Sequence, residues 1–82
     1  MKLPEKILYY RKKAGLSQEA LAEQIGISRQ AISKWETGEA VPEISKLVSL
    51  AKVFNVSVDL LLSEDDFDEQ PSESEEFAKS TN

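Results

Sequence analysis

The sequence has neither cysteine nor histidine, and each absence removes a class of protein. Without cysteine there is no disulfide framework and no thiolate metal site. Without histidine the chain lacks the commonest general base and the commonest metal ligand. No stretch reaches the ~18 consecutive apolar residues of a membrane span, and none near the start is typical of a secretory signal. We expect a cytoplasmic protein without membrane contact, metal or cofactor.

Catalytic motifs are missing as well. The sequence has no Gly-rich phosphate loop and no metal-ligand spacing. Its carboxylates are concentrated near the C-terminus, where no rigid element would position a pair for acid–base chemistry. With 82 residues, one domain without a large enclosed pocket is expected. These features predict that the protein is not an enzyme.

The net charge of −5 is unevenly distributed along the chain. Residues 1–63 hold nine Lys and Arg against seven Asp and Glu, whereas residues 64–82 hold one Lys against eight Asp and Glu. We interpret 1–63 as a mildly basic domain and 64–82 as an acidic tail. The tail is poor in apolar residues, so we expect it to be disordered. It is an inert solubilising end, a competitor that screens the basic domain, or a linker to a further C-terminal domain, and we favour the first or the last.

Apolar periodicity and capping residues divide the domain into five helices and no strand. Leu3, Ile7 and Tyr10 have the i, i+4, i+7 spacing of one helix face. The first predicted helix is Pro4–Ala14, the second is capped by Ser17 and ended by Gly26, and the third runs from Ser28 to Thr37 and is followed by Gly38. The fourth is Ile44–Phe54, with Leu47, Val48 and Ala51 on its apolar stripe and Asn55 at its end. The fifth is a short helix, Val58–Leu62, capped by Ser57. Together they predict an all-α domain.

The third predicted helix has two different faces. With 3.6 residues per turn, Ala31, Ile32 and Trp35 lie within roughly 100° of one another. We therefore interpret Trp35 as a core residue rather than a platform on which bases stack. The opposite face carries four polar side chains and no acidic one: Arg29, Gln30, Ser33 and Lys34.

That polar face is chemically suited to reading DNA. In the major groove Arg pairs with guanine, Gln pairs with adenine, and Ser and Lys are more permissive. Arg29 and Gln30 are at the N-terminal end of their helix, the end that usually points into the groove. Gln18 begins the preceding helix, where backbone N–H groups can receive a phosphate oxygen. Taken alone, the face is equally compatible with an ordinary solvated surface.

The segment LSQEALAEQIGISRQAISKWETGEAVP, followed by LVSLAKVFNVSVDLLL, resembles the Cro/Xre-type helix-turn-helix family of bacterial and phage regulators. The resemblance extends from about Leu3 to Leu62. It implies a compact five-helix, lambda-repressor-like DNA-binding domain that acts as a homodimer on an inverted-repeat operator. We therefore expect a bacterial or phage-type transcriptional regulator, and more specifically a repressor, whose partner is double-stranded DNA.

The resemblance also implies roles for individual residues. The positions that match base-contacting residues are Arg29, Gln30, Ser33 and Lys34, and the DNA backbone contacts are assigned to Gln18, Ser28, Thr37 and Arg11. Arg11 and Glu36 match a frequent ion pair between the first and third helices. The sequence departs from the family pattern at Glu43, in place of a Ser-type helix cap, at Tyr10, in place of an aliphatic residue, and at Thr37, in place of Asn or Arg.

Some features keep two interpretations. Lys12 and Lys13 either contact phosphate or form a solvated helix end. Leu50, Val53 and Leu60 lie outside the main apolar stripe and are candidates for a dimer contact, although single exposed apolar residues are common. The alternative function is a protein-interaction module, antitoxin-like or an adaptor, with DNA binding secondary. Such a module should present aromatic and apolar anchors rather than the polar face described above.

Overall fold

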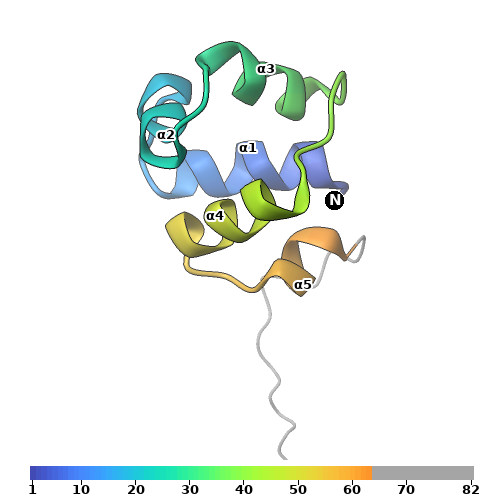
Figure 1. Ribbon diagram of the computed structural model, residues 1–82. Coiled ribbons are helices and arrows are strands. Elements are labelled where there is room, and N and C mark those ends of the chain that lie inside the picture. Colours follow the sequence, from blue (N-terminus) through green and yellow to red (C-terminus); the bar gives the residue numbers. More distant parts are fainter. Residues whose placement is uncertain (64–82) are drawn as a thin grey trace, which may run out of the picture.

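Five helices and their connecting turns make up residues 1–63, the part of the chain that the computed structural model describes (Figure 1). They are α1 (Leu3–Lys13), α2 (Gln18–Ile25), α3 (Arg29–Thr37), α4 (Ile44–Phe54) and α5 (Val58–Leu62). Every predicted helix is present with bounds within one residue of the prediction, and residues 1–63 contain no strand. The disorder expected for 64–82 concerns residues outside this range.

Serine hydroxyls fix where three of the helices begin. The Oγ atoms of Ser17, Ser28 and Ser57 accept hydrogen bonds from the backbone N–H three residues later, at 2.9, 3.2 and 3.0 Å. Each bond satisfies one of the N–H groups that a helix start leaves without a partner. By contrast, α4 begins after Glu43 without a side-chain capping bond. The departure of Glu43 from the family pattern predicted this difference.

The turn between α2 and α3 depends on Gly26. Its φ of 75° is left-handed, a conformation that costs an L-residue roughly 1–2 kcal/mol but costs glycine little. The N–H groups of Gly26 and Ile27 both donate to the carbonyl of Ala22, which closes α2. The chain then reaches the Ser28 cap within two residues, so the turn holds α3 at a fixed angle to α2.

The core lies where the inner faces of the five helices meet. The interplanar angle between the rings of Tyr10 and Phe54 is 29° and their centroids are 5.9 Å apart, so Tyr10 is part of the core despite its departure from the family pattern. Trp35 is 6% exposed and is a core residue, as predicted. The buried apolar residues are Ile7, Tyr10, Leu21, Ala22, Ile25, Ile32, Trp35, Leu47, Leu50, Ala51, Phe54 and Leu61.

The buried side of α4 differs from the predicted one. Ile44 and Val48, which belong to the predicted apolar stripe, are 68% and 37% exposed, whereas Leu50 is fully buried. The interpretation of Leu50 as a dimer contact is therefore wrong. Two helical stripes share Leu47, Ala51 and Phe54, and spacing alone does not distinguish them. The packing of α4 against α1, α2 and α5 selects the stripe that includes Leu50.

A buried lysine joins the two ends of the domain. Lys6 of α1 is fully buried, and its Nζ donates to the backbone carbonyl of Leu60 at 2.5 Å and to that of Ser63. A helix of five residues is unstable by itself in water, so α5 depends on its packing and on its ends. Ser57 Oγ accepts a hydrogen bond from an N–H group in the first turn of α5, and Lys6 donates to carbonyl groups at its C-terminal end. Apolar spacing and capping residues did not predict this contact.

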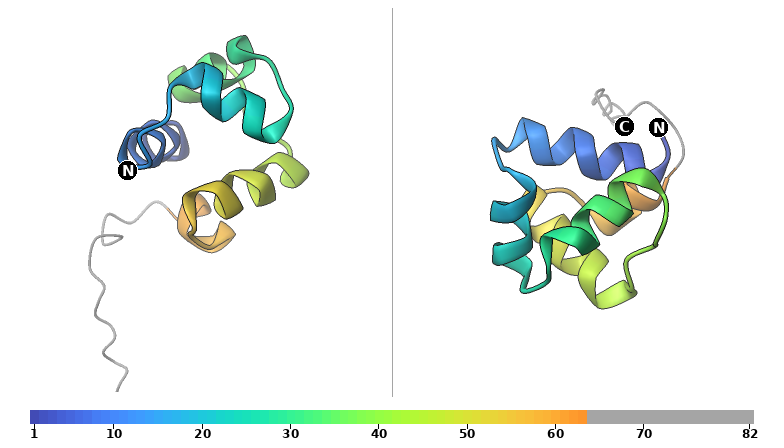
Figure 2. Two further views of the ribbon diagram at one scale, coloured as in Figure 1. Left: turned by 90° about the vertical axis from the view of Figure 1, so that its left-hand side faces the viewer. Right: turned by 90° about the horizontal axis from the view of Figure 1, so that it is seen from above.

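The position of α3 leaves one of its sides open. It packs against α2 and α1, and its opposite side forms an edge of the domain (Figure 1). Seen from above, α3 is the helix nearest the viewer and nothing crosses over it (Figure 2). Within residues 1–63, no helix combines the length and hydropathy that crossing a bilayer requires.

Candidate functional site

The open side of α3 carries the four residues predicted to contact bases. Arg29, Gln30 and Lys34 are exposed and Ser33 is half-buried. The acidic residue of this helix, Glu36, is turned inward, with its side chain 6% exposed. The helix therefore presents hydrogen-bond donors to solvent without an interspersed carboxylate.

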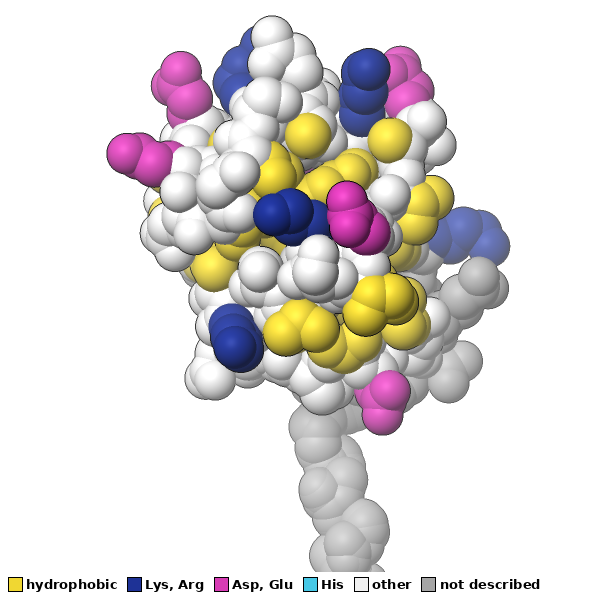
Figure 3. All heavy atoms as spheres, viewed as in Figure 1, with side chains coloured by type: hydrophobic (Ala, Val, Ile, Leu, Met, Phe, Trp, Pro, Cys, Tyr) yellow, Lys and Arg dark blue, Asp and Glu magenta, His cyan; other side chains and the backbone are white. Residues whose placement is uncertain are grey.

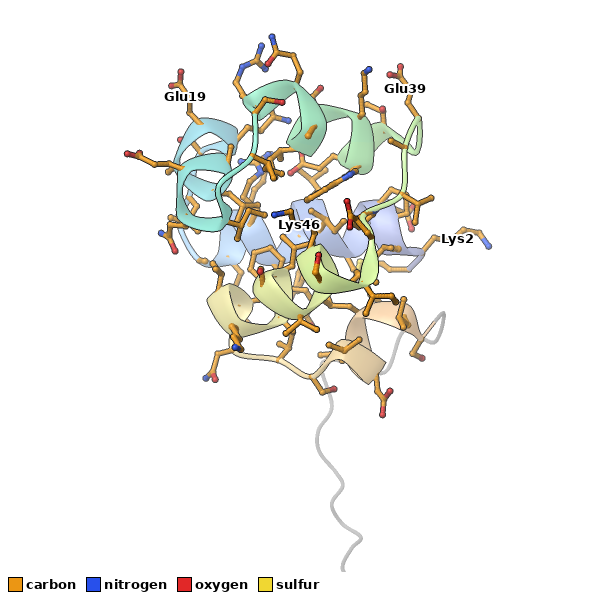
Figure 4. The ribbon with its side chains drawn as sticks, in the orientation of Figure 1. Lys2, Glu19, Glu39 and Lys46 are labelled. Atoms are coloured by element: carbon orange, nitrogen blue, oxygen red, sulfur yellow. The ribbon has the colours of Figure 1, made fainter. Side chains whose placement is uncertain are left out.

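Charged side chains also mark the two ends of this surface. In the stick view, Glu19 of α2 and Glu39 after α3 point to the same side as the open face of α3, one beyond each end of the helix (Figure 4). The space-filling view shows basic and acidic side chains along this edge and hydrophobic side chains lower down, over α4 and α5 (Figure 3). Because carboxylates repel phosphate, Glu19 and Glu39 limit how far an anion-accepting surface extends along α3.

A buried ion pair lies beneath the open face, between α1 and α3. Arg11 donates from Nε to Glu36 Oε2 at 2.6 Å and from Nη2 to Glu36 Oε1 at 3.2 Å. Its Nη1 donates to the carbonyl of Leu16 at 2.9 Å. The two side chains are 11% and 6% exposed, so solvent screens the pair weakly. The predicted ion pair is confirmed.

Gln18 connects this ion pair to the open face of α3. Its Nε2 donates to Glu36 Oε1 at 2.9 Å, and its Oε1 accepts from Arg29 Nη1 at 3.3 Å. A continuous chain of hydrogen bonds thus runs from Arg11 through Glu36 and Gln18 to Arg29. The sequence did not predict this chain, because the pairing of residues on three helices depends on how those helices cross.

The residues predicted to contact the DNA backbone have different surroundings. Ser28 is exposed, and its Oγ caps α3. Thr37 is exposed, but its hydroxyl already donates to the carbonyl of Lys34 at 3.2 Å. Arg11 points inward toward Glu36. The phosphate contacts of these residues and of Gln18 stay predictions; the hydroxyl donor of Thr37 is already used, and the side chain of Arg11 is only 11% exposed.

Apolar anchors for a protein partner are missing from this face. Among residues 1–63 the exposed large hydrophobic side chains are Tyr9, Val41, Ile44, Val48 and Leu62, and none of them belongs to α3. In the same range, no three His, Cys, Asp or Glu side chains are grouped to hold a metal ion. The arrangement is suited to contacts with a polar, anionic partner.

Comparisons with known proteins identify one family. A model of a helix-turn-helix family, described as "Helix-turn-helix", matches residues 7–61. The transcriptional activator BcrR of Enterococcus faecalis is 46% identical over 63 residues, which are 77% of this chain and 31% of BcrR. The first curated relatives are longer proteins, of which the chain spans between 28% and 54%.

Two solved structures resemble the domain in a DNA-bound form. The c2 repressor of Salmonella phage P22 in complex with a synthetic operator has a TM-score of 0.75 and 38% identity, over 79% of this chain and 98% of that one. SinR from Bacillus subtilis in complex with DNA has a TM-score of 0.70 and 34% identity, over 74% of this chain and 98% of that one.

Proposed function

Because the chain belongs to the Cro/C1-type helix-turn-helix family, we propose that it binds double-stranded DNA by docking α3 in the major groove. The observation that carries this proposal is the uncovered face of α3, whose outward side chains are hydrogen-bond donors without an interspersed carboxylate. An α-helix fits the width of the major groove, where each base pair presents a distinct pattern of donors and acceptors. The regulator would read that pattern with Arg29, Gln30, Ser33 and Lys34.

Phosphate contacts would set the position of the helix along the DNA. Backbone contacts fix register and orientation, and contacts to base edges supply sequence preference. Gln18 and Ser28 stand at the start of α2 and of α3, where free N–H groups favour an anion. The described domain carries nine Lys and Arg against seven Asp and Glu, so its own charge does not oppose DNA.

The regulator acts, in this proposal, as a homodimer on an inverted repeat and represses by covering a promoter. Two copies related by a two-fold axis would place their α3 helices about 34 Å apart, one turn of DNA. The P22 repressor, which the domain resembles with a TM-score of 0.75, was solved in complex with a synthetic operator, and this supports binding to an operator duplex. The protein would be cytoplasmic and without enzymatic activity.

Residues 1–63 would form the DNA-binding domain, and residues 64–82 would be a linker or an inert end. The length of the relatives supports a linker, since the matched region makes up only 28% to 54% of the first four curated relatives. The charge of the acidic segment would then keep it away from the phosphates.

The Gln30→Ala variant should lose preference for one base pair and weaken binding to the selected site by ~1–3 kcal/mol. The reason is that a glutamine recognises adenine through two hydrogen bonds that alanine lacks. Binding to the selected duplex and to duplexes changed at single base pairs measures the effect.

The matched control for this experiment is Gln24→Ala, which removes an exposed glutamine from α2. It should leave both affinity and base preference unchanged. If Gln30→Ala instead weakens binding equally on every duplex, Gln30 contacts phosphate and does not read a base.

A further inference from the structure

The hydrogen-bond chain beneath α3 has a defined direction. The carboxylate of Glu36 only accepts hydrogen bonds. It accepts from Arg11 through both oxygens and from Gln18 Nε2 through Oε1. The amide nitrogen of Gln18 must therefore face Glu36, and the amide oxygen faces the other way. That oxygen accepts a hydrogen bond from Arg29 Nη1.

The chain also runs from a rigid end to a solvent-exposed end. The side chains of Glu36 and Arg11 are 6% and 11% exposed and hold each other through two bonds. Gln18 is half-buried, and Arg29 is exposed at the first position of α3. A long exposed side chain normally samples many rotamers, and fixing it costs entropy on binding. The hydrogen bond that Arg29 donates to the half-buried Gln18 offsets part of that cost before DNA arrives.

We propose that Glu36 is a positioning residue for base recognition, which acts through the amide of Gln18 to hold the guanidinium of Arg29 for contact with a guanine. This inference rests on the proposed docking of α3 in the major groove. Arg29 uses one of its five N–H donors for Gln18, so a forked pair is left for the O6 and N7 acceptors of guanine. The buried ion pair thereby contributes to sequence preference as well as to stability.

Exchange of the Glu36 carboxylate for an amide gives a specific test. In Glu36→Gln, the amide oxygen retains the 2.6 Å bond from Arg11 Nε when it takes the Oε2 position, and the amide nitrogen at the Oε1 position then faces the donors Arg11 Nη2 and Gln18 Nε2. Gln18 relieves its part of this conflict by turning its oxygen toward residue 36 and its nitrogen toward Arg29. The nitrogen of Gln18 and the guanidinium of Arg29 are then two donors facing each other, and Arg29 is released. Gln18→Met has the same effect on Arg29 by removing the link, and it leaves the Arg11–Glu36 pair intact.

The experiment compares affinities of the full chain for duplexes that differ at one base pair. Sites selected from randomised duplex DNA by the wild type and by Arg29→Met identify the guanine that depends on Arg29. At that position, the preference for guanine over the other bases should fall roughly 2- to 10-fold in Glu36→Gln and in Gln18→Met, the scale of one hydrogen bond. When either change is combined with Arg29→Met, the double variant should have the same guanine preference as Arg29→Met alone. Because the readout is the ratio of affinities for two duplexes, a loss of phosphate contacts that weakens binding to both equally leaves the ratio unchanged.

Arg11→Met is the control for stability. It breaks the same ion pair from the other side but leaves Glu36 able to accept from Gln18. It should lower the unfolding temperature and preserve the guanine preference of the folded protein. Circular dichroism at the binding temperature verifies that each variant is folded.

The outcomes separate this inference from the proposed function. If the wild type selects no sequence, both fail. If the wild type selects a site but Arg29→Met changes no base preference, the inference fails and DNA binding stands. The same conclusion follows if Glu36→Gln and Gln18→Met keep the guanine preference, or if Arg11→Met loses it as fully as Glu36→Gln.

Discussion

Replacement of Lys6 by methionine should lower the free energy of unfolding by roughly 3–6 kcal/mol. Lys6 is fully buried, and its Nζ donates to the carbonyls of Leu60 and Ser63. Methionine has nearly the same length but no donor, so both carbonyls lose their bond to Nζ while the cavity stays filled. Bonds to a charged group are worth about 1.5–3 kcal/mol each, and this site has two. Urea denaturation monitored by circular dichroism measures the loss.

The loss should be concentrated in α5. The N–H of Leu61 donates to Ser57 and that of Ser63 donates to Asp59, so the hydrogen exchange of these two amides reports whether α5 is formed. Both should exchange faster in Lys6→Met. The matched control is Lys12→Met on the exposed side of α1, which should change stability by no more than about 0.5 kcal/mol. Equal stability of the two variants would show that Lys6 is not a structural clamp.

The second large effect concerns the register of α4. Leu50→Ala should destabilise the domain by about 2–5 kcal/mol, because Leu50 is fully buried and its removal leaves a cavity in the core. Ile44→Ala removes a side chain of the same size from a position that is 68% exposed, and its effect should stay within about 0.5 kcal/mol. Chemical denaturation of both variants measures the two values. A reversed order of the two losses would mean that α4 buries the stripe with Ile44 and Val48.

Local signals account for the part of the fold that was predicted. Ser17, Ser28 and Ser57 cap their helices through atoms three residues away, and Gly26 closes α2 by its own φ angle. Such features are decided within one turn of helix, so sequence alone locates them. The amphipathic pattern of α3 is local in the same sense, and it predicted both the buried Trp35 and the open polar face.

Features that depend on helix crossing were not predictable from spacing. The choice between Ile44 and Leu50 depends on which side of α4 meets α1, α2 and α5. The contact of Lys6 with Ser63 joins residues at opposite ends of the domain, and the contact of Gln18 with Glu36 joins two helices. The Arg11–Glu36 pair is equally distant in sequence, and only the family resemblance indicated it.

Selection of bound sites from randomised duplex DNA tests the central claim most directly. The full chain should enrich two half-sites in inverted orientation, about 10 base pairs from centre to centre, with positions that depend on the exposed residues of α3. In parallel selections, Gln30→Ala should lose preference at one position in each half-site, and Gln24→Ala should reproduce the wild-type site. Enrichment of no sequence would contradict the claim that α3 is a recognition helix and would favour a protein partner for the domain.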